Sequence, residues 1–180
     1  MDVICTFDYN ILTWIAEHLV TDPLTAVMRF ITTLGDGGMI WIFLALLFLL
    51  RPATRKCGYA MIVALLMSLL VNNLLIKSLV ARPRPFLQYS ELIPLIAPPG
   101  GYSFPSGHSS SSFAAAFSCF MHNKKAGVPL IVLAALIAFS RLYVCVHFPT
   151  DVLCGSFLGI LLGVFASKAI NHLSNFVKQK

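Results

Sequence analysis

Five long apolar runs constrain this chain of 180 residues more than any other feature. They lie at Met39–Leu50, Tyr59–Val80, Ser109–Met121, Val128–Val146 and Val152–Ile170. Hydrophobic residues make up 58% of the sequence and charged residues 11%, which is more apolar surface than a soluble domain of this size could bury. Because lipid offers no partner for backbone amides, and no run alternates apolar with polar residues, each run is expected to be a membrane-spanning helix. The sequence predicts one all-α domain over residues 1–180, with a bundle of five transmembrane helices over residues 37–170.

Two parts of the chain depart from a plain apolar run. The third run is rich in Ser and Ala, and such small residues favour a central position packed against other helices. Between Phe7 and Thr33, apolar residues recur at helical spacing among polar ones, and Pro23 interrupts the pattern. This is typical of one or two amphipathic helices on the membrane surface, so residues 1–36 are expected to be interfacial. A sixth, weakly hydrophobic span is the alternative.

Lys and Arg residues between the runs indicate the orientation in the membrane. Three basic groups fall on one side of a five-helix bundle: Arg51, Arg55 and Lys56; Lys124 and Lys125; and Lys168, Lys178 and Lys180. The positive-inside rule makes that side cytoplasmic, and the expected location is the cell membrane. Four other basic residues then fall on the outer side, where the rule does not explain them: Lys77, Arg82, Arg84 and Arg141. The net charge of +6 does not indicate nucleic-acid binding, because the basic residues form no stripe with interleaved aromatic residues.

Three of the outer cations, Lys77, Arg84 and Arg141, lie at or just inside the apolar boundary. A single cation there is usually a membrane anchor whose charged end reaches for water. Three on one face are different, because Glu91 and Asp151 are the only acidic residues after the second run. An anionic ligand would balance this charge, and Arg together with Lys suits a phosphate group.

The segment Pro105-Ser106-Gly107-His108 opens the third run. The first turn of a helix has free backbone N–H groups and favours an anion. Gly107 permits close backbone approach, Ser106 adds a hydroxyl donor, and His108 would reach the same anion. The alternative is a plain N-cap serine beside a histidine with no role in binding.

His147 and Asp151 are four residues apart between the fourth and fifth runs. On a helical turn they would face each other, although Pro149 makes that geometry less certain. A carboxylate on one ring nitrogen fixes the tautomer and makes the other nitrogen a better nucleophile. The alternative is an aspartate that caps the fifth helix beside an unrelated histidine. A metal site on the two histidines and Asp151 is disfavoured, because three nearby cations would repel a divalent ion.

Read together, these segments resemble the type 2 phosphatidic acid phosphatase superfamily. Its pattern is Lys, six residues, Arg-Pro; then Pro-Ser-Gly-His; then Ser-Arg, five residues, His, three residues, Asp. This sequence has all of it, as Lys77 with Arg84-Pro85, Pro105 to His108, and Ser140-Arg141 with His147 and Asp151. The flanking runs are similar to the membrane branch of the family, which includes phosphatidylglycerophosphatase B and undecaprenyl-diphosphatase. The stretch Thr33-Leu-Gly-Asp-Gly37 also looks like a segment of small bacterial members.

The resemblance implies a mechanism without a metal or other cofactor. The phosphoryl oxygens would be held by Lys77, Arg84, Ser106, the Gly107 amide and Arg141. His147 would form a phosphohistidine, Asp151 would orient it, and His108 would protonate the leaving oxygen. Arg82 and the serines at 109–112 lie beside the motifs and receive no catalytic role.

The implied substrate is a lipid phosphate or diphosphate at the outer membrane face. Undecaprenyl diphosphate, phosphatidylglycerophosphate and phosphatidic acid are the candidates. A lipid phosphotransferase with the same intermediate is the alternative. An anion or lipid transporter is less favoured, because the cytoplasmic half has no matching intramembrane charges. The loop from Phe86 to Phe104 mixes apolar residues with prolines and glycines, and it is expected to lie on the membrane surface and help admit lipid; a plain loop fits equally well.

Overall fold

The computed structural model describes residues 3–178, and within that range the chain is all-helical, without a strand. Its elements are α1 (Val3–His18), α2 (Asp22–Leu34), η1 (Asp36–Gly38), α3 (Met39–Leu49), α4 (Arg55–Ser68), η2 (Leu69–Ile76), α5 (Lys77–Val80), α6 (Pro85–Gln88), α7 (Gly107–Phe120), α8 (Lys124–Tyr143) and α9 (Pro149–Lys178). Lys180 and the side chain of Lys178, both from the third basic group, lie outside the described residues. The predicted all-α architecture is confirmed, and each of the five apolar runs corresponds to a helix.

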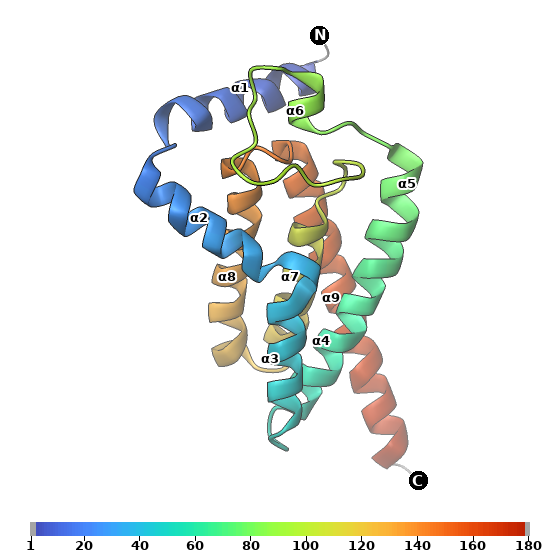
Figure 1. Cartoon of the computed structure of the whole chain (residues 1–180). Coiled ribbons are helices and arrows are strands. Elements are labelled where there is room, and N and C mark those ends of the chain that lie inside the picture. The colour runs from blue at the N-terminus through green and yellow to red at the C-terminus, as the bar shows by residue number, and fades with distance from the viewer. Residues whose placement is uncertain (1–2, 179–180) are drawn as a thin grey trace.

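The helices form a bundle with α7 at its centre (Figure 1). α7 packs against α4, α8 and α9, while α3 packs against α4. Most serines and alanines of α7 are buried, so the prediction of a protein-packed third helix is confirmed. α1 crosses one end of the bundle, and α2 descends from it along α8. The N-terminal segment therefore forms two helices, which are separated just before Pro23.

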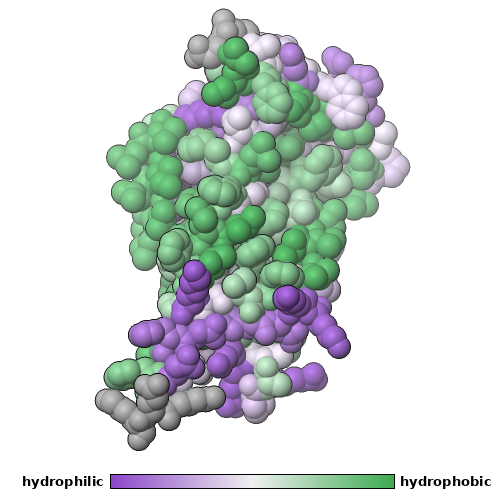
Figure 2. Space-filling model, turned by 180° about the vertical axis from the view of Figure 1, so that it is seen from behind, coloured by the Kyte–Doolittle hydropathy of each residue, from purple (hydrophilic) through white to green (hydrophobic). Residues whose placement is uncertain are grey.

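Three helical segments are long and apolar enough to cross a membrane: Arg55–Gln88, Lys124–Tyr143 and Pro149–Phe176. A fourth is present if α2 and the η1–α3 segment, which meet at a bend of 48°, form one broken span. Figure 2 shows a broad hydrophobic band, with a hydrophilic belt at the end of the bundle where the C-terminus lies. The chain is thus a multi-pass membrane protein with three to four spans by length and hydropathy. α7 is not among them, since its 14 residues reach only about 21 Å.

α4, η2 and α5 continue without a break from Arg55 to Val80. The η2 part is a π-helix, a wider turn that is frequent at functional sites. Ala81 then adopts a left-handed conformation with φ 49°, and Pro83 cannot donate a helical hydrogen bond. This long helix and its end bring Lys77 and the two following arginines to one end of the bundle.

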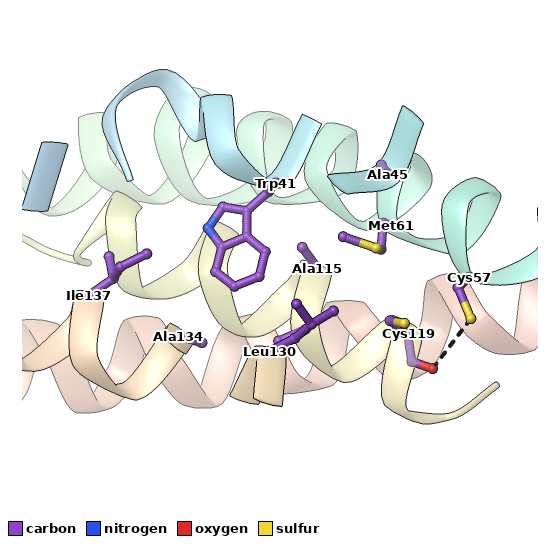
Figure 3. Packing of buried hydrophobic residues seen from close by; sticks show 10 residues of the cluster. Trp41, Ala45, Cys57, Met61, Ala115, Cys119, Leu130, Ala134 and Ile137 are labelled. Atoms are coloured by element: carbon purple, nitrogen blue, oxygen red, sulfur yellow. Dashed lines mark hydrogen bonds between the residues drawn. The ribbon is translucent and has the colours of Figure 1, made fainter. Parts of the chain in front are cut away.

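A buried cluster around Trp41 holds α3, α4, α7 and α8 together (Figure 3). The indole is fully buried among side chains that include Met61, Leu130 and Ile137. Its Nε1 donates to Ser112 Oγ over 2.9 Å, which removes the cost of burying that N–H group. Burial of an aromatic side chain of this size contributes roughly 2–3 kcal/mol. The cluster fixes α3 against α7, the helix that carries His108.

Close contact between α7 and α9 depends on three glycines spaced four residues apart, Gly155, Gly159 and Gly163. A Cβ atom on Gly159 would lie 2.4 Å from the Ser110 carbonyl oxygen, and one on Gly155 would lie 2.6 Å from the Ser106 carbonyl oxygen. Small residues at this spacing let helix backbones approach closely in lipid. The glycines therefore bring α9 directly against α7 along most of its length, from Ser106 to Ser118.

Replacing Gly159 by alanine is expected to destabilise the protein, although alanine favours a helix over glycine by about 1 kcal/mol. The added methyl group must push α7 and α9 apart, which should cost about 1–3 kcal/mol. The measurement is the midpoint of thermal unfolding in detergent. Gly100→Ala is the control, because a Cβ there meets nothing within 4 Å. An unchanged midpoint for Gly159→Ala would contradict the close packing.

Candidate active site

One cavity of about 600 Å³ gathers residues from all three motifs. Six of the eight predicted site residues line it: Lys77, Arg84, Gly107, His108, Arg141 and His147. No carboxylate is among the described residues of its lining. Three cations and two imidazoles from distant parts of the sequence therefore line the same cavity. This agrees with the sequence, which placed all five residues on one face of the bundle. Such a cavity attracts an anion.

His147 lies in the turn between α8 and α9 and is 2% exposed. Arg84 Nη1 is 3.3 Å from its Nε2, and since a guanidinium can only donate, Nε2 is the unprotonated nitrogen. The proton is then on Nδ1, which lies 3.6 Å from Asp151 Oδ2, slightly farther than a hydrogen bond. Burial lowers the pKa of His147 to about 3, against the opposing effect of Asp151. The ring is therefore neutral at pH 7, and Nε2 has a lone pair for nucleophilic attack.

Asp151 combines two functions that the sequence left as alternatives. Its Oδ2 accepts a hydrogen bond from the Phe148 N–H group over 2.8 Å, which caps the first turn of α9. The same oxygen accepts a short hydrogen bond from Ser103 Oγ. Because α9 begins at Pro149, His147 precedes the helix instead of lying on its first turn. The aspartate thus caps α9 and also faces His147.

Backbone carbonyl groups orient Arg84, which is 4% exposed. Its guanidinium donates to the oxygens of Gly100 at 3.0 Å, Gly101 at 3.1 Å and Val146 at 2.9 Å. Gly100 and Gly101 belong to the segment of residues 89–106, which joins α6 to α7. The charge of Arg84 is therefore fixed beside His147 without neutralisation by a carboxylate. A preorganised cation next to a nucleophile can bind phosphoryl oxygens and stabilise their developing charge.

Arg141, near the end of α8, is 3% exposed. Its Nη1 donates to Thr32 Oγ1 of α2 over 2.5 Å, whereas its Nε has no acceptor among the described residues. A buried N–H group without a partner is costly. A phosphoryl oxygen in the cavity would provide the missing acceptor. The sequence did not predict the contribution of Thr32.

His108, in the first turn of α7, pairs with Asp36, a residue that the sequence analysis assigned no role. Nε2 of His108 lies 2.9 Å from Asp36 Oδ1 and 3.5 Å from Arg141 Nη1. The shorter contact is with a carboxylate, which can only accept, so Nε2 is assigned a proton. Gly35 makes room for the ring, because a Cβ there would lie 2.5 Å from His108 Cδ2. The similarity of Thr33-Leu-Gly-Asp-Gly37 to small family members was the one sequence signal for this pair.

Ser106 occupies a different position from that expected of a phosphate ligand. It is fully buried, and its hydroxyl caps α7 by accepting from the Ser109 N–H group at 3.4 Å and from Ser109 Oγ at 2.9 Å. It is not among the residues that line the cavity, unlike its neighbour Gly107. The cap that the sequence left as an alternative is present, and direct phosphate binding by Ser106 stays a prediction.

A family profile of the PAP2 superfamily matches residues 58–174, a range that includes all three motifs. This chain belongs to the PAP2 superfamily. Over 157 residues it is 33% identical to undecaprenyl-diphosphatase BcrC of Bacillus subtilis, with 86% of this chain and 79% of that protein covered. Over 179 residues it is 34% identical to phosphatidylglycerophosphatase B of Bacillus subtilis, with 92% of this chain and 84% of that protein covered.

Solved structures agree with this assignment. The first transmembrane PAP2 type phosphatidylglycerolphosphate phosphatase from Bacillus subtilis is 27% identical, with a TM-score of 0.76 over 96% of this chain and 88% of that one. Aquifex aeolicus LpxE has the same fold at 23% identity, with a TM-score of 0.79 over 89% of this chain and 94% of that one. The family predicted from the motifs is confirmed, and so is the class of enzyme, a lipid phosphatase.

The PAP2 cavity continues from the cations into an apolar groove between α3 and α4. The groove is lined by Ile42 and Leu46 of α3, Ile62, Leu65 and Leu66 of α4, and Leu69 of η2. Leu46, Leu66 and Leu69 are about half exposed, at 53%, 55% and 48%. Since these exposed side chains belong to the hydrophobic band of the bundle, the cavity opens sideways between α3 and α4.

The segment of residues 89–106 is mostly held by protein contacts. Leu92 is 3% exposed, while Leu95 and Ile96 pack against a cluster that includes residues of α2 and α8. Arg29 of α2 donates to the Leu95 carbonyl oxygen over 2.7 Å. Of the four residues Leu92, Ile93, Leu95 and Ile96, Ile93 alone is widely exposed, at 71%. The segment thus holds Arg84 in the PAP2 site and contributes Pro99 to the lining of the cavity, whereas the leucines and isoleucines of the lining belong to α3, α4 and η2.

Arg82 contacts the PAP2 site, although no role was predicted for it. Its Nη1 donates to Asp151 Oδ1 over 2.7 Å, and its Nη2 donates to Asp8 Oδ2 over 2.7 Å. Asp8 lies in α1 and is fully buried. Arg82 therefore links Asp8 of α1 to Asp151, the carboxylate that faces His147.

Proposed function

We propose that this chain is a five-span enzyme of the cell membrane that hydrolyses a lipid phosphate or diphosphate at its extracytoplasmic face, through a phosphohistidine on His147. The observation that carries the proposal is the division of one cavity into a cationic end with two imidazoles and an apolar end that opens between α3 and α4. A phosphate head with an apolar tail fits both ends. The two relatives from Bacillus subtilis are named for substrates of this form, undecaprenyl diphosphate and phosphatidylglycerophosphate.

The proposed chemistry pairs a neutral His147 with a His108 imidazolium, the form that Asp36 and a bound phosphate group stabilise. Nε2 of His147 attacks phosphorus in line, and the bond from phosphorus to the leaving oxygen breaks. The electron pair stays on that oxygen, which takes the Nε2 proton of the His108 imidazolium. Arg84, Arg141 and Lys77 stabilise the charge on the phosphoryl oxygens as it spreads. His108, now neutral, accepts a proton from the water that attacks phosphorus, while the bond from phosphorus to Nε2 of His147 breaks and its electron pair returns to that nitrogen.

Five spans and an outward-facing site agree with the charges of the chain. α3 and α7 are short, but both pack against longer helices, and α7 is surrounded by protein so that lipid need not cover it. The first two basic groups follow α3 and α7, at the opposite end of the bundle from His147. The positive-inside rule then assigns the site to the outer face. Val3, Ile4, Phe7 and Trp14 of α1 are exposed apolar residues, which supports an interfacial position for that helix.

The experiment that tests this function is phosphate release by the purified protein from undecaprenyl diphosphate, phosphatidylglycerophosphate and phosphatidic acid, with EDTA present. Residues 3–178 contain no group of three His, Cys, Asp or Glu residues that could hold a metal ion, so we expect EDTA to leave turnover unchanged. Product analysis with an added acceptor lipid separates hydrolysis from phosphotransfer. Failure to release phosphate from any of the three lipids would reject the proposal.

Blocking the apolar groove should affect long-chain substrates selectively. Leu69→Trp is expected to raise KM for a long-chain substrate by about 10-fold, since the larger side chain occupies the tail site, and to change KM for a water-soluble short-chain ester less than twofold. Leu153→Trp on α9 is the matched control, because Leu153 is 61% exposed and does not line the cavity. Equal changes for both substrates would contradict a tail site in this groove.

A further inference from the structure

Asp8 of α1 is fully buried and makes three polar contacts, all with groups next to the site. Its carboxylate accepts from Arg82 Nη2 at 2.7 Å, from the Thr150 N–H group at 2.9 Å and from Thr150 Oγ1 at 2.5 Å. Arg82 in turn donates to Asp151 Oδ1 at 2.7 Å and to Thr150 Oγ1 at 2.8 Å, with its guanidinium carbon 4.0 Å from the centroid of the Phe148 ring. Asp8, Arg82 and Asp151 thus form a chain of alternating charge behind His147.

We propose that Asp8 and Arg82 are positioning residues of the phosphatase site, which hold Asp151 in place and keep the charge behind His147 negative. The inference rests on the proposed function, because it assumes that His147 is the nucleophile and that Asp151 supports it. Neither Asp8 nor Arg82 lines the cavity, so both act through Asp151.

The orientation of Asp151 depends on donors other than His147. Phe148 and Ser103 donate to Oδ2, the oxygen that faces the histidine. Arg82 is the charged donor and holds the opposite oxygen, Oδ1. Because the carboxylate is planar, fixing Oδ1 also fixes the direction in which Oδ2 points. Loss of Arg82 would remove the charged donor to Oδ1 and loosen the orientation of Asp151, which Phe148 and Ser103 would then hold through Oδ2 alone.

The charge of Asp8 becomes important when the phosphohistidine forms. As Nε2 bonds to phosphorus, the His147 ring keeps its Nδ1 proton and becomes a cation. Arg82 alone would neutralise Asp151 and leave that cation with no net negative charge behind it. Asp8 restores a net charge of −1 to the Asp8–Arg82–Asp151 chain. Because this chain of charges is largely shielded from water, loss of one unit of charge is expected to alter the rate about 10- to 100-fold.

Burial of Asp8 is also costly for a helix that only lies on the membrane. A buried carboxylate requires a paired cation and further donors to offset its lost hydration. The inward face of α1 already contains Leu12 and Ile15, both buried, which anchor the helix without any charge. Placement of Asp8 beside Arg82 therefore indicates a function other than anchoring.

The test compares Asp8→Asn, Arg82→Gln and the double variant in the purified full-length protein. Asp8→Asn is expected to lower kcat about 10- to 100-fold and to change KM less than about threefold, since the residue does not contact substrate. The double variant should have a kcat at least about threefold above that of Asp8→Asn, because removal of Arg82 restores the net negative charge. Glu17→Gln, an exposed acid on the same helix, is the matched control and should retain wild-type kcat.

Two results would overturn the inference. One is a kcat for Asp8→Asn within twofold of the wild type. The other is a double variant with lower kcat and lower unfolding midpoint than either single variant, which identifies Asp8 as an anchor of α1. Full activity in His147→Asn would instead reject the proposed function itself, so the two failures are distinguishable.

Discussion

Replacement of His147 by asparagine is expected to lower kcat for lipid dephosphorylation by about 10⁴-fold or more, because it removes the nucleophile. Asparagine is the informative choice, since its side-chain amide can occupy the position of Nδ1 and face Asp151 while nothing replaces Nε2. The guanidinium of Arg84 then has no nitrogen to approach at 3.3 Å. The measurement is phosphate release in detergent, combined with acid-labile labelling of the protein by a substrate labelled at phosphorus. We expect neither turnover nor label.

The matched control for this variant is His122→Asn. His122 follows α7 at the opposite end of the bundle, where its Nε2 lies 3.1 Å from Ser167 Oγ. It should retain wild-type kcat, and both variants should unfold near the wild-type midpoint. A His147→Asn protein that is folded and keeps more than about 1% of the wild-type kcat would remove this residue from the nucleophile position.

The central part of the site could be predicted from sequence because each motif ends or begins an apolar run on the same face. Lys77 closes one run, His108 opens another, and His147 lies between two more. Once the number and direction of the runs are set, these residues must meet at one membrane depth. Composition and hydropathy determine that arrangement without any knowledge of side-chain packing.

Contacts from the N-terminal helices could not be predicted in the same way. Asp36 meets His108 at a separation of 72 residues, and Asp8 meets Thr150 at a separation of 142. Both pairs depend on how α1 and α2 fold back over the bundle, which local periodicity does not specify. These helices were expected to be interfacial, and no role in the site was predicted for their acidic residues.

The helix boundaries near the third motif could not be predicted from the sequence either. The spacing of His147 and Asp151 suggested one helical turn, but Cys145 has a φ of 58° and the chain turns before α9 begins. The left-handed conformation at a non-glycine residue is set by tertiary packing rather than by local preference. By contrast, the spacing of Gly155, Gly159 and Gly163 is visible in the sequence and indicates that the fifth run packs closely against another helix.

Replacement of His108 by asparagine is expected to lower kcat most for the substrate with the most basic leaving group. For a phosphate monoester with an alkoxide leaving group, loss of the general acid should lower kcat about 10³-fold. A lipid diphosphate leaves as a phosphate monoester, a far weaker base, and should lose less. A nitrophenyl ester needs no proton, so its initial burst of nitrophenolate, which reports the first step alone, should change less than about threefold.

Asp36→Asn should lower kcat for the three substrates in the same order as His108→Asn, but by smaller factors. The carboxylate lies 2.9 Å from His108 Nε2 and favours the protonated ring, but it is 54% exposed, so water partly replaces it. We expect a loss of about 10-fold for the alkyl ester and almost none for the nitrophenyl ester. Asp22→Asn, an exposed acid at the start of α2, is the control. If the three substrates lost activity equally in His108→Asn, the imidazole would be a phosphate ligand rather than a proton donor, because binding of the phosphoryl group does not depend on what leaves it.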